Sequence, residues 1–284
     1  MRWRGRRQST HVDDRRRMGG GRKMAFGGGI GGIVLIALFM LLGGDPQELM
    51  DQQSGLLDPA QSVETTGPLP DDEMAQFVSV VLADTEDVWK QIFSASGLTY
   101  REPTLVLFRG QVQSACGFSS AATGPFYCPG DEKIYIDLLF LEDMQRKFQT
   151  PGDFAVAYIL AHEVGHHVQQ LLGIMDRIQD RSGWQRGRLD SQQLVRLELQ
   201  ADFLAGVWAH HAQRMSNILE EGDIDEALNA AQAVGDDRIQ KRTQGYIVPD
   251  SFTHGTSEQR LHWLLKGIRT GDPNQGDTFS ADIR

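Results

Sequence analysis

The stretch that decides the fold runs from Asp153 to Leu172 and reads DFAVAYILAHEVGHHVQQLL. Its apolar residues recur at helical spacing, and Gly173 follows as a helix stop signal. On a helix, His162 and His166 are four residues apart and share one face, with Glu163 beside them. The two imidazoles can therefore reach the same metal ion.

This spacing is the H-E-x-x-H motif of zinc hydrolases. Zinc accepts neutral imidazole nitrogens and keeps a further position open for water, from which a nearby carboxylate can take a proton. We therefore predict that His162 and His166 bind zinc and that Glu163 is the general base. The alternative is a pair of solvated helix histidines. However, Tyr158 and Ile159 lie on the same stripe, and burial without a metal would leave polar rings in the core.

Charge is divided unevenly along the 284 residues. Residues 1–23 carry nine Arg and Lys against two Asp, a charge of +7, and the remainder carries −17, for a total of −10. The length and the 40% hydrophobic content suit one globular domain with additional segments. A basic start could be a nucleic-acid-binding arm, but the apolar segment after it favours two environments and no nucleic-acid partner.

That apolar segment, Met24 to Gly44, has the length of a bilayer-spanning helix. Its small residues lie inside the segment, so retention is expected rather than cleavage as a signal peptide. The basic flank places residues 1–23 in the cytoplasm and the catalytic domain in the periplasm or outside the cell. The pairs Gly27/Gly31 and Gly28/Gly32 could join two such helices in a homo-oligomer, or be glycines that lipid tolerates.

The remaining chain divides into a linker, a domain and a tail. Residues 45–70 are rich in Pro and Gly without apolar periodicity, as in a linker. The catalytic domain is predicted over 71–272, and residues 273–284 form a loose tail. Within the domain we expect helices at 71–93, 153–172, 191–215, 223–234 and 257–268, strands at 104–108 and 133–138, and a surface excursion at 174–190. The second strand could pair with an extended substrate backbone.

Cys116 and Cys128 are the two cysteines of the chain and lie in a Gly/Ser-rich loop between the predicted strands. In a domain outside the cytoplasm, a lone pair twelve residues apart is most simply a disulfide. A metal site would need more ligands nearby, and the loop has none.

A catalytic zinc site needs a third protein ligand. Glu198 is the best candidate, because a carboxylate within an apolar helical stripe is costly unless it is paired or coordinated. Asp202, one turn later, can accept a hydrogen bond from the other nitrogen of a ligand histidine and so fix its tautomer. The alternative for Glu198 is an exposed carboxylate paired with Arg196 or Arg188.

The order of these motifs resembles a known group. The H-E-x-x-H motif followed by Glu198 and Asp202 is similar to the gluzincin arrangement of thermolysin-like and related membrane peptidases. The basic start, the apolar segment and the runs GPFYCP (124–129), RLELQAD (196–202) and DSFTHGTSEQR (250–260) resemble the bacterial YpfJ-like family of neutral zinc metallopeptidases over nearly the whole chain. The resemblance implies an α+β, zincin-like domain, mostly helical with a small sheet, that uses Zn²⁺ on a peptide or protein substrate. Phe203 departs from the small residue or cysteine expected in relatives.

His254 lies in a loop ahead of the predicted helix that begins at Ser257, a place from which a ring can reach over a cleft. It resembles the Thr-His loop of related membrane gluzincins, where the histidine is assigned near the substrate. We therefore expect a catalytic donor to the oxyanion, the alternative being a histidine that packs or caps the turn.

The predicted function is hydrolysis of peptide bonds by zinc-activated water in a membrane-anchored, single-pass enzyme. One alternative is a zinc hydrolase of a non-peptide amide, such as a cell-wall bond. The other is a non-catalytic, membrane-anchored zinc-binding protein.

Overall fold

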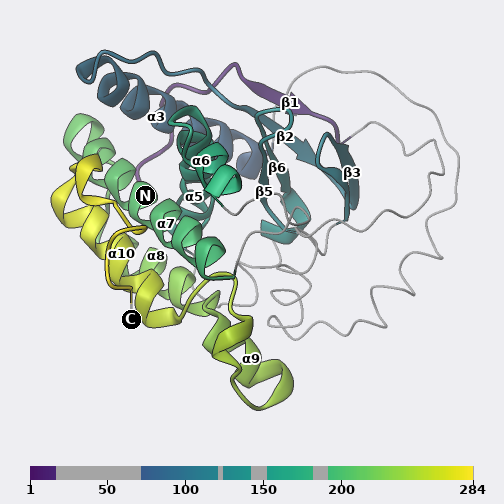
Figure 1. Cartoon of the computed structure of the whole chain (residues 1–284). Helices are drawn as coiled ribbons and strands as arrows, with labels where there is room; N and C mark the ends of the chain where they lie inside the picture. The colour runs from purple at the N-terminus through teal and green to yellow at the C-terminus, as the bar shows by residue number, and fades with distance from the viewer. Residues whose placement is uncertain (17–71, 121–123, 142–151, 182–190, 284) are drawn as a thin grey trace, which may run out of the picture. The chain divides into compact units, whose positions relative to one another are not determined.

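The computed structural model describes residues 1–16, 72–120, 124–141, 152–181 and 191–283. These divide into two compact units, one formed by Met1–His11, Gln76–Pro103 and Gly152–Arg284, the other by Val12–Ala75 and Thr104–Pro151. The first unit is helical and the second holds the sheet (Figure 1). The predicted class, mostly helical with a small sheet, is confirmed.

Helix α7 is the centre of the helical unit, since it contacts both α5 and α10 (Figure 1). Helix α8 also contacts α5 and α10. The predicted helices are present. Helix α6 lies in the segment predicted as a surface excursion, and α9 lies where no helix was predicted. The bounds are α3 (Glu73–Ala95), α5 (Asp153–Leu171), α6 (Ile174–Arg181), α7 (Ser191–Ser216), α8 (Asp223–Ala233), α9 (Asp236–Gln244) and α10 (Ser257–Thr270), with short 3₁₀ turns η2 (Pro249–Ser251) and η3 (Pro273–Gln275).

Glycines let α7 approach its two neighbours closely. A Cβ at Gly206 of α7 would lie 2.3 Å from the carbonyl oxygen of Leu264 in α10. A Cβ at Gly165, inside the H-E-x-x-H motif, would lie 2.9 Å from the carbonyl oxygen of Ala201 in α7. Real Cβ atoms do not approach this closely, so glycine at Gly165 brings the backbone of the motif directly against the helix that carries Glu198.

The second unit contains a four-stranded sheet in the order β1-β2-β6-β5, with β1, β2 and β6 parallel and β5 antiparallel. Strand β6 therefore pairs with β2 on one side and, over Lys133–Tyr135, with β5 on the other, so at those three residues it has no free edge for the substrate backbone that the sequence suggested. A separate antiparallel hairpin joins β3 and β4. The bounds are β1 (Val12–Asp14), β2 (Thr104–Phe108), β3 (Gln111–Ser114), β4 (Gly117–Ser120), β5 (Phe126–Cys128) and β6 (Lys133–Asp137).

The disulfide between Cys116 and Cys128 is present, with Cα atoms 5.8 Å apart. It ties the turn of the β3–β4 hairpin to the end of β5. The predicted pairing is confirmed, and the described residues contain no free cysteine.

The N-terminal segment differs most from the prediction, which set residues 1–23 apart from the folded domain. In the helical unit, the Trp3 ring packs edge-on against Phe77 with ring centroids 5.4 Å apart. Arg7 Nη1 and the Ser9 hydroxyl both donate to Glu86, a carboxylate of α3 that is 1% exposed. Arg6 and Arg7 thus pair with acidic side chains of α3, and the basic residues at the start of the chain balance the charge of the helical unit.

In the sheet unit, Val12–Asp14 forms strand β1 and pairs in parallel with Leu105–Leu107 of β2, as the purple strand in Figure 1 shows. The separation of residues 1–16 from the folded domain is therefore wrong. The predicted linker and the predicted membrane segment Met24–Gly44, with its glycine pairs, lie outside the described residues. None of the helices in the described ranges is long and apolar enough to cross a membrane.

The C-terminal tail is also better ordered than predicted. Thr278 is fully buried, its hydroxyl donates to the carbonyl of Arg196 at 2.6 Å, and Arg196 Nη1 donates to the carbonyl of Ala281 at 3.0 Å. Phe203, the departure noted in the sequence, packs near this tail, because a Cβ at Gly276 would lie 2.4 Å from its ring. The prediction of a loose tail from residue 273 onward is wrong.

Candidate metal centre

Helices α5 and α7 bring the three predicted ligands together. His162 Nε2 lies 3.1 Å from one oxygen of Glu198, and His166 Nε2 lies 3.5 Å from the other. One donor atom from each residue lies within 4.8 Å of the donors of the other two. Two imidazole nitrogens and one carboxylate oxygen are a donor set that suits Zn²⁺ with a position left for water. The residues present therefore fit a zinc ion.

The outer nitrogen of each histidine is already engaged. His162 Nδ1 donates to Asp202 Oδ1 at 2.8 Å, as predicted for Asp202. His166 Nδ1 donates to Gln169 Oε1 at 2.9 Å. With the proton held on Nδ1, both rings present the lone pair of Nε2 to the space beside Glu198, the state that a metal requires.

Imidazoles and carboxylates in this cluster shift one another's pKa values toward the charged forms. Burial disfavours the charged ring of His162, but the carboxylates of Asp202 and Glu198 outweigh burial and raise its pKa to about 10. Burial would likewise raise the pKa of Glu198, but His166 and His162, with a smaller effect from His254, hold it well below its usual range. In the absence of a cation, the two imidazoles thus balance the charge of Glu198, and a divalent cation can take over that role.

Asp202 is itself held by a buried network that the sequence reasoning missed. Its Oδ2 accepts from Arg260 Nε at 2.7 Å, and its Oδ1 accepts from Arg260 Nη2 at 2.9 Å and from the Tyr158 hydroxyl at 2.6 Å. Arg260 is 4% exposed and Asp202 fully buried. Burial raises the pKa of Asp202, but Arg260 and His162 overcome it and lower the pKa to about 2. The sequence signal for Tyr158 was its position one turn before His162 on the same stripe.

His254 lies in a turn organised by Asp236, the first residue of α9. Asp236 Oδ2 accepts from the backbone N–H groups of Thr253, His254 and Gly255 at 2.7, 2.7 and 3.1 Å. Its other oxygen lies 3.2 Å from His254 Nδ1. Burial would raise the pKa of Asp236, but the bonds to His254 lower it. The structure therefore holds His254 rigidly and 8% exposed, within electrostatic reach of Glu198.

Glu163 is 9% exposed. Burial lowers the pKa of His166, but Glu198, with a smaller effect from the nearby Glu163, raises it above its usual value. The adjacent His167 points elsewhere: it is fully buried, and its Nε2 donates to the carbonyl of Arg101 at 2.6 Å. It is therefore a packing residue.

A second acidic group, Asp153, Asp223 and Glu226, also has donor atoms close together. The α-ammonium of Met1 lies 2.7 Å from Asp153 and 3.2 Å from Asp223. Glu226 accepts from the backbone N–H of Phe154 at the start of α5. A cation of the chain itself and a helix N-terminus thus account for these carboxylates.

Comparison with known proteins gives the class. Residues 1–279 match the family described as "Putative neutral zinc metallopeptidase", and the chain belongs to that family. It is 47% identical over 293 aligned residues to "Uncharacterized protein YpfJ" of Escherichia coli K12, covering 100% of both chains. It is 41% identical over 260 residues to "Uncharacterized protein Rv2575" of Mycobacterium tuberculosis H37Rv, covering 85% of each chain. No solved structure matches.

Proposed function

We propose that the chain is a zinc-dependent metallopeptidase that hydrolyses peptide bonds, with Zn²⁺ held by His162, His166 and Glu198. The observation that carries the proposal is the convergence of these three donors in a member of a zinc metallopeptidase family. Structural zinc sites use four protein ligands, whereas three ligands beside a carboxylate such as Glu163 suit hydrolysis.

Each residue then has a chemical role. When bound, zinc would supply Lewis acidity, which makes water nucleophilic near neutral pH and polarises the peptide carbonyl. Glu163 would take the proton of the attacking water and pass it to the leaving amine. Asp202 would keep the proton of His162 on Nδ1, so that Nε2 stays a ligand.

His254 would be the second donor to the oxyanion. Because Asp236 holds the backbone and the Nδ1 side of the ring, Nε2 lies on the opposite side of the ring from Asp236. Nδ1 faces a carboxylate and therefore carries a proton, so the ring donates from Nε2 when it is the doubly protonated imidazolium. A donor aimed at developing charge is worth roughly 10²- to 10³-fold in rate.

The test compares the wild-type protein with Glu163→Gln, a substitution of equal size that removes the base. Both proteins are loaded with zinc and incubated with an unfolded protein, and the released peptides are identified by mass spectrometry. We expect equal zinc content and peptides from the wild type alone. In a parallel incubation with purified cell wall, release of wall fragments by a protein that yields no peptides would point to a non-peptide amide. Zinc binding without hydrolysis of either substrate would point to a non-catalytic protein.

Membrane attachment through Met24–Gly44, with the domain outside the cytoplasm, is a separate proposal that rests on the sequence alone. It must meet one constraint. Met1–His11 packs within the metal-binding unit, whereas a single crossing would place these two parts on opposite sides of the membrane. Cysteines are introduced at Arg4 and at Glu258, and intact cells are treated with an impermeant maleimide. If Met1–His11 packs within the metal-binding unit of the membrane-attached protein, both cysteines are labelled. If the single crossing holds, only the second is labelled.

A further inference from the structure

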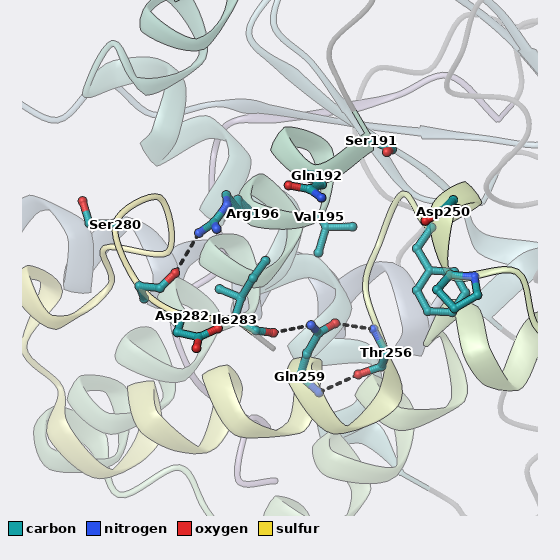
Figure 2. Close-up of a pocket in the computed structure, with 13 residues that line it drawn as sticks. Ser191, Gln192, Val195, Arg196, Asp250, Thr256, Gln259, Ser280, Asp282 and Ile283 are labelled. Carbon is teal, nitrogen blue, oxygen red and sulfur yellow. Dashed lines mark hydrogen bonds between the residues drawn. The ribbon is translucent and has the colours of Figure 1, made fainter.

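The C-terminal tail, Gly276–Ile283, lies along the side of α7 and is held by three side chains. Arg196 binds the carbonyls of Thr278 and Ala281, and Gln259 Nε2 donates to the carbonyl of Ile283. Figure 2 shows Arg196 and Gln259 reaching toward this tail from α7 and α10. The third side chain, Gln200, binds the beginning of the tail: its Nε2 donates to the carbonyl of Gly276 at 2.8 Å.

Gln200 also contacts helix α5 through Gln169. It lies on α7 two residues after Glu198 and is 8% exposed. Its Oε1 accepts from Gln169 Nε2 at 3.1 Å. A single amide therefore connects the tail to α5, the helix that carries the H-E-x-x-H motif.

The hydrogen bonds of Gln169 define which way its amide points. This side chain is fully buried, and its nitrogen donates to the carbonyl of Leu197 at 2.8 Å as well as to Gln200. A backbone carbonyl can only accept, so the atom facing Leu197 must be the nitrogen. The oxygen then faces His166 Nδ1 at 2.9 Å and must accept its proton. Gln169 thereby fixes the tautomer that leaves Nε2 of His166 for a metal.

The three bonds form one directional chain. His166 donates to Gln169, Gln169 donates to Gln200, and Gln200 donates to the carbonyl of Gly276. Each amide donates in one direction and accepts from the other, so reversing one amide would place two donors or two acceptors face to face. The approach of the tail is close: a Cβ at Gly276 would lie 2.4 Å from the ring of Phe203.

We propose that Gln169 and Gln200 are positioning residues for His166 and that the C-terminal tail, through the carbonyl of Gly276, completes the metal centre. The two ligand histidines are then oriented differently. Asp202 holds His162 with a charged oxygen, whereas a neutral relay that ends in the tail holds His166. Removing the outer partner of a ligand histidine weakens metal binding by about 10- to 100-fold. The proposal rests on the proposed zinc site.

The test measures zinc affinity by competition with a chromophoric chelator for the wild type, Gln169→Leu, Gln200→Leu and the double variant. We expect Gln169→Leu to weaken binding by about 10- to 100-fold. Gln200→Leu should weaken it by a smaller factor. In the double variant, Gln200→Leu should cause no additional loss, because the relay is already broken at Gln169. Gln192→Leu, an exposed glutamine of the same helix, is the matched control and should bind zinc as the wild type does.

Two further measurements separate positioning from simple packing. The visible absorption of Co²⁺-loaded protein reports ligand geometry, and it should change in Gln169→Leu but not in Gln192→Leu. A chain that ends at Asp272 lacks the tail but keeps Gln169 and Gln200. It should lose zinc affinity by the same factor as Gln200→Leu, and Gln200→Leu should add nothing in that shortened chain.

The proposal is overturned if Gln200→Leu and the shortened chain both bind zinc within twofold of the wild type, or if the losses of the two glutamine variants multiply in the double variant. A lower midpoint of thermal unfolding with unchanged zinc affinity would overturn it as well, since packing alone explains that result. A wild-type protein that binds no zinc contradicts the proposed function itself and is thereby distinguished from failure of the relay.

Discussion

Arg260 offers the sharpest test of how the metal centre is supported, because it joins α10 to the carboxylate behind His162. Its guanidinium makes two hydrogen bonds to Asp202, at 2.7 and 2.9 Å, and one to the Tyr158 hydroxyl at 3.2 Å. Arg260→Met removes these bonds but keeps much of the buried aliphatic stem. The loss of packing is therefore small, and the electrostatic effect dominates.

The expected loss of stability follows from the partners that Asp202 keeps in the variant. Asp202 is fully buried, and without Arg260 it keeps the hydrogen bonds from Tyr158 and His162 but loses its strongest cationic partner. Removing one partner of a buried ion pair costs about 3–5 kcal/mol, because the other charge stays in a medium of low polarity. The pKa of Asp202 should rise in the variant, since Arg260 is the strongest influence that lowers it.

The assay is urea unfolding of the metal-free protein, which excludes effects of zinc affinity. We expect Arg260→Met to lower the free energy of unfolding by about 3–5 kcal/mol. The double variant Asp202→Asn with Arg260→Met should lose clearly less, because it buries no unpaired charge. Arg269→Met, an exposed arginine on the same helix, should change stability by less than about 0.5 kcal/mol. A loss below about 1 kcal/mol for Arg260→Met, or losses that simply add in the double variant, would refute the reasoning.

Three further outcomes are expected. Trp3→Ala should lower the free energy of unfolding by about 3 kcal/mol, because the ring is 9% exposed and packs on α3; an unchanged urea midpoint would mean that the N-terminal segment is not part of the fold. Replacing Cys116 and Cys128 by serine should cost about 3 kcal/mol by the loop-entropy relation, and reduction of the wild type should reproduce the loss. His254→Ala should keep zinc and stability but lower kcat by about 10²- to 10³-fold, whereas unchanged kcat would assign His254 to packing. Asp236→Asn should also lower kcat, because Asp236 positions the His254 ring.

Sequence reasoning found the parts of the site that are local. His162, Glu163 and His166 lie within one turn and a half of a helix, so their spacing alone places them on one face. Glu198 was found because a carboxylate in an apolar stripe needs a partner, and Asp202 because it follows one turn later. Both arguments use a single helix.

The missed residues depend on contacts between distant segments. Arg260 and Asp202 are 58 residues apart, and Gln200 and Gly276 are 76 apart. A polar residue on an amphipathic helix gives no sign of which distant segment it will meet. Strand β1 was missed for a similar reason, since three residues in a basic segment show no alternation and become a strand only by pairing with β2.

The packing of Met1–His11 shows that a basic composition has two possible uses. Arginines beside an apolar segment predict a cytoplasmic flank. In the structure the same arginines pair with acidic groups of the folded unit, Arg6 with Asp84 at 2.6 Å and Arg7 with Asp87 at 2.7 Å. Charge alone does not distinguish these two uses.

In the proposed centre, two imidazoles and one carboxylate hold a zinc ion. This ligand set is tested most directly by the X-ray absorption spectrum of zinc in the purified protein. We predict one zinc per chain with two imidazole ligands, the remaining ligands being oxygen, at about 2.0–2.2 Å. Glu198→Ala should change the spectrum and lower zinc occupancy. A protein without zinc, a spectrum with sulfur ligands, or an unchanged spectrum in Glu198→Ala would contradict the assignment of His162, His166 and Glu198.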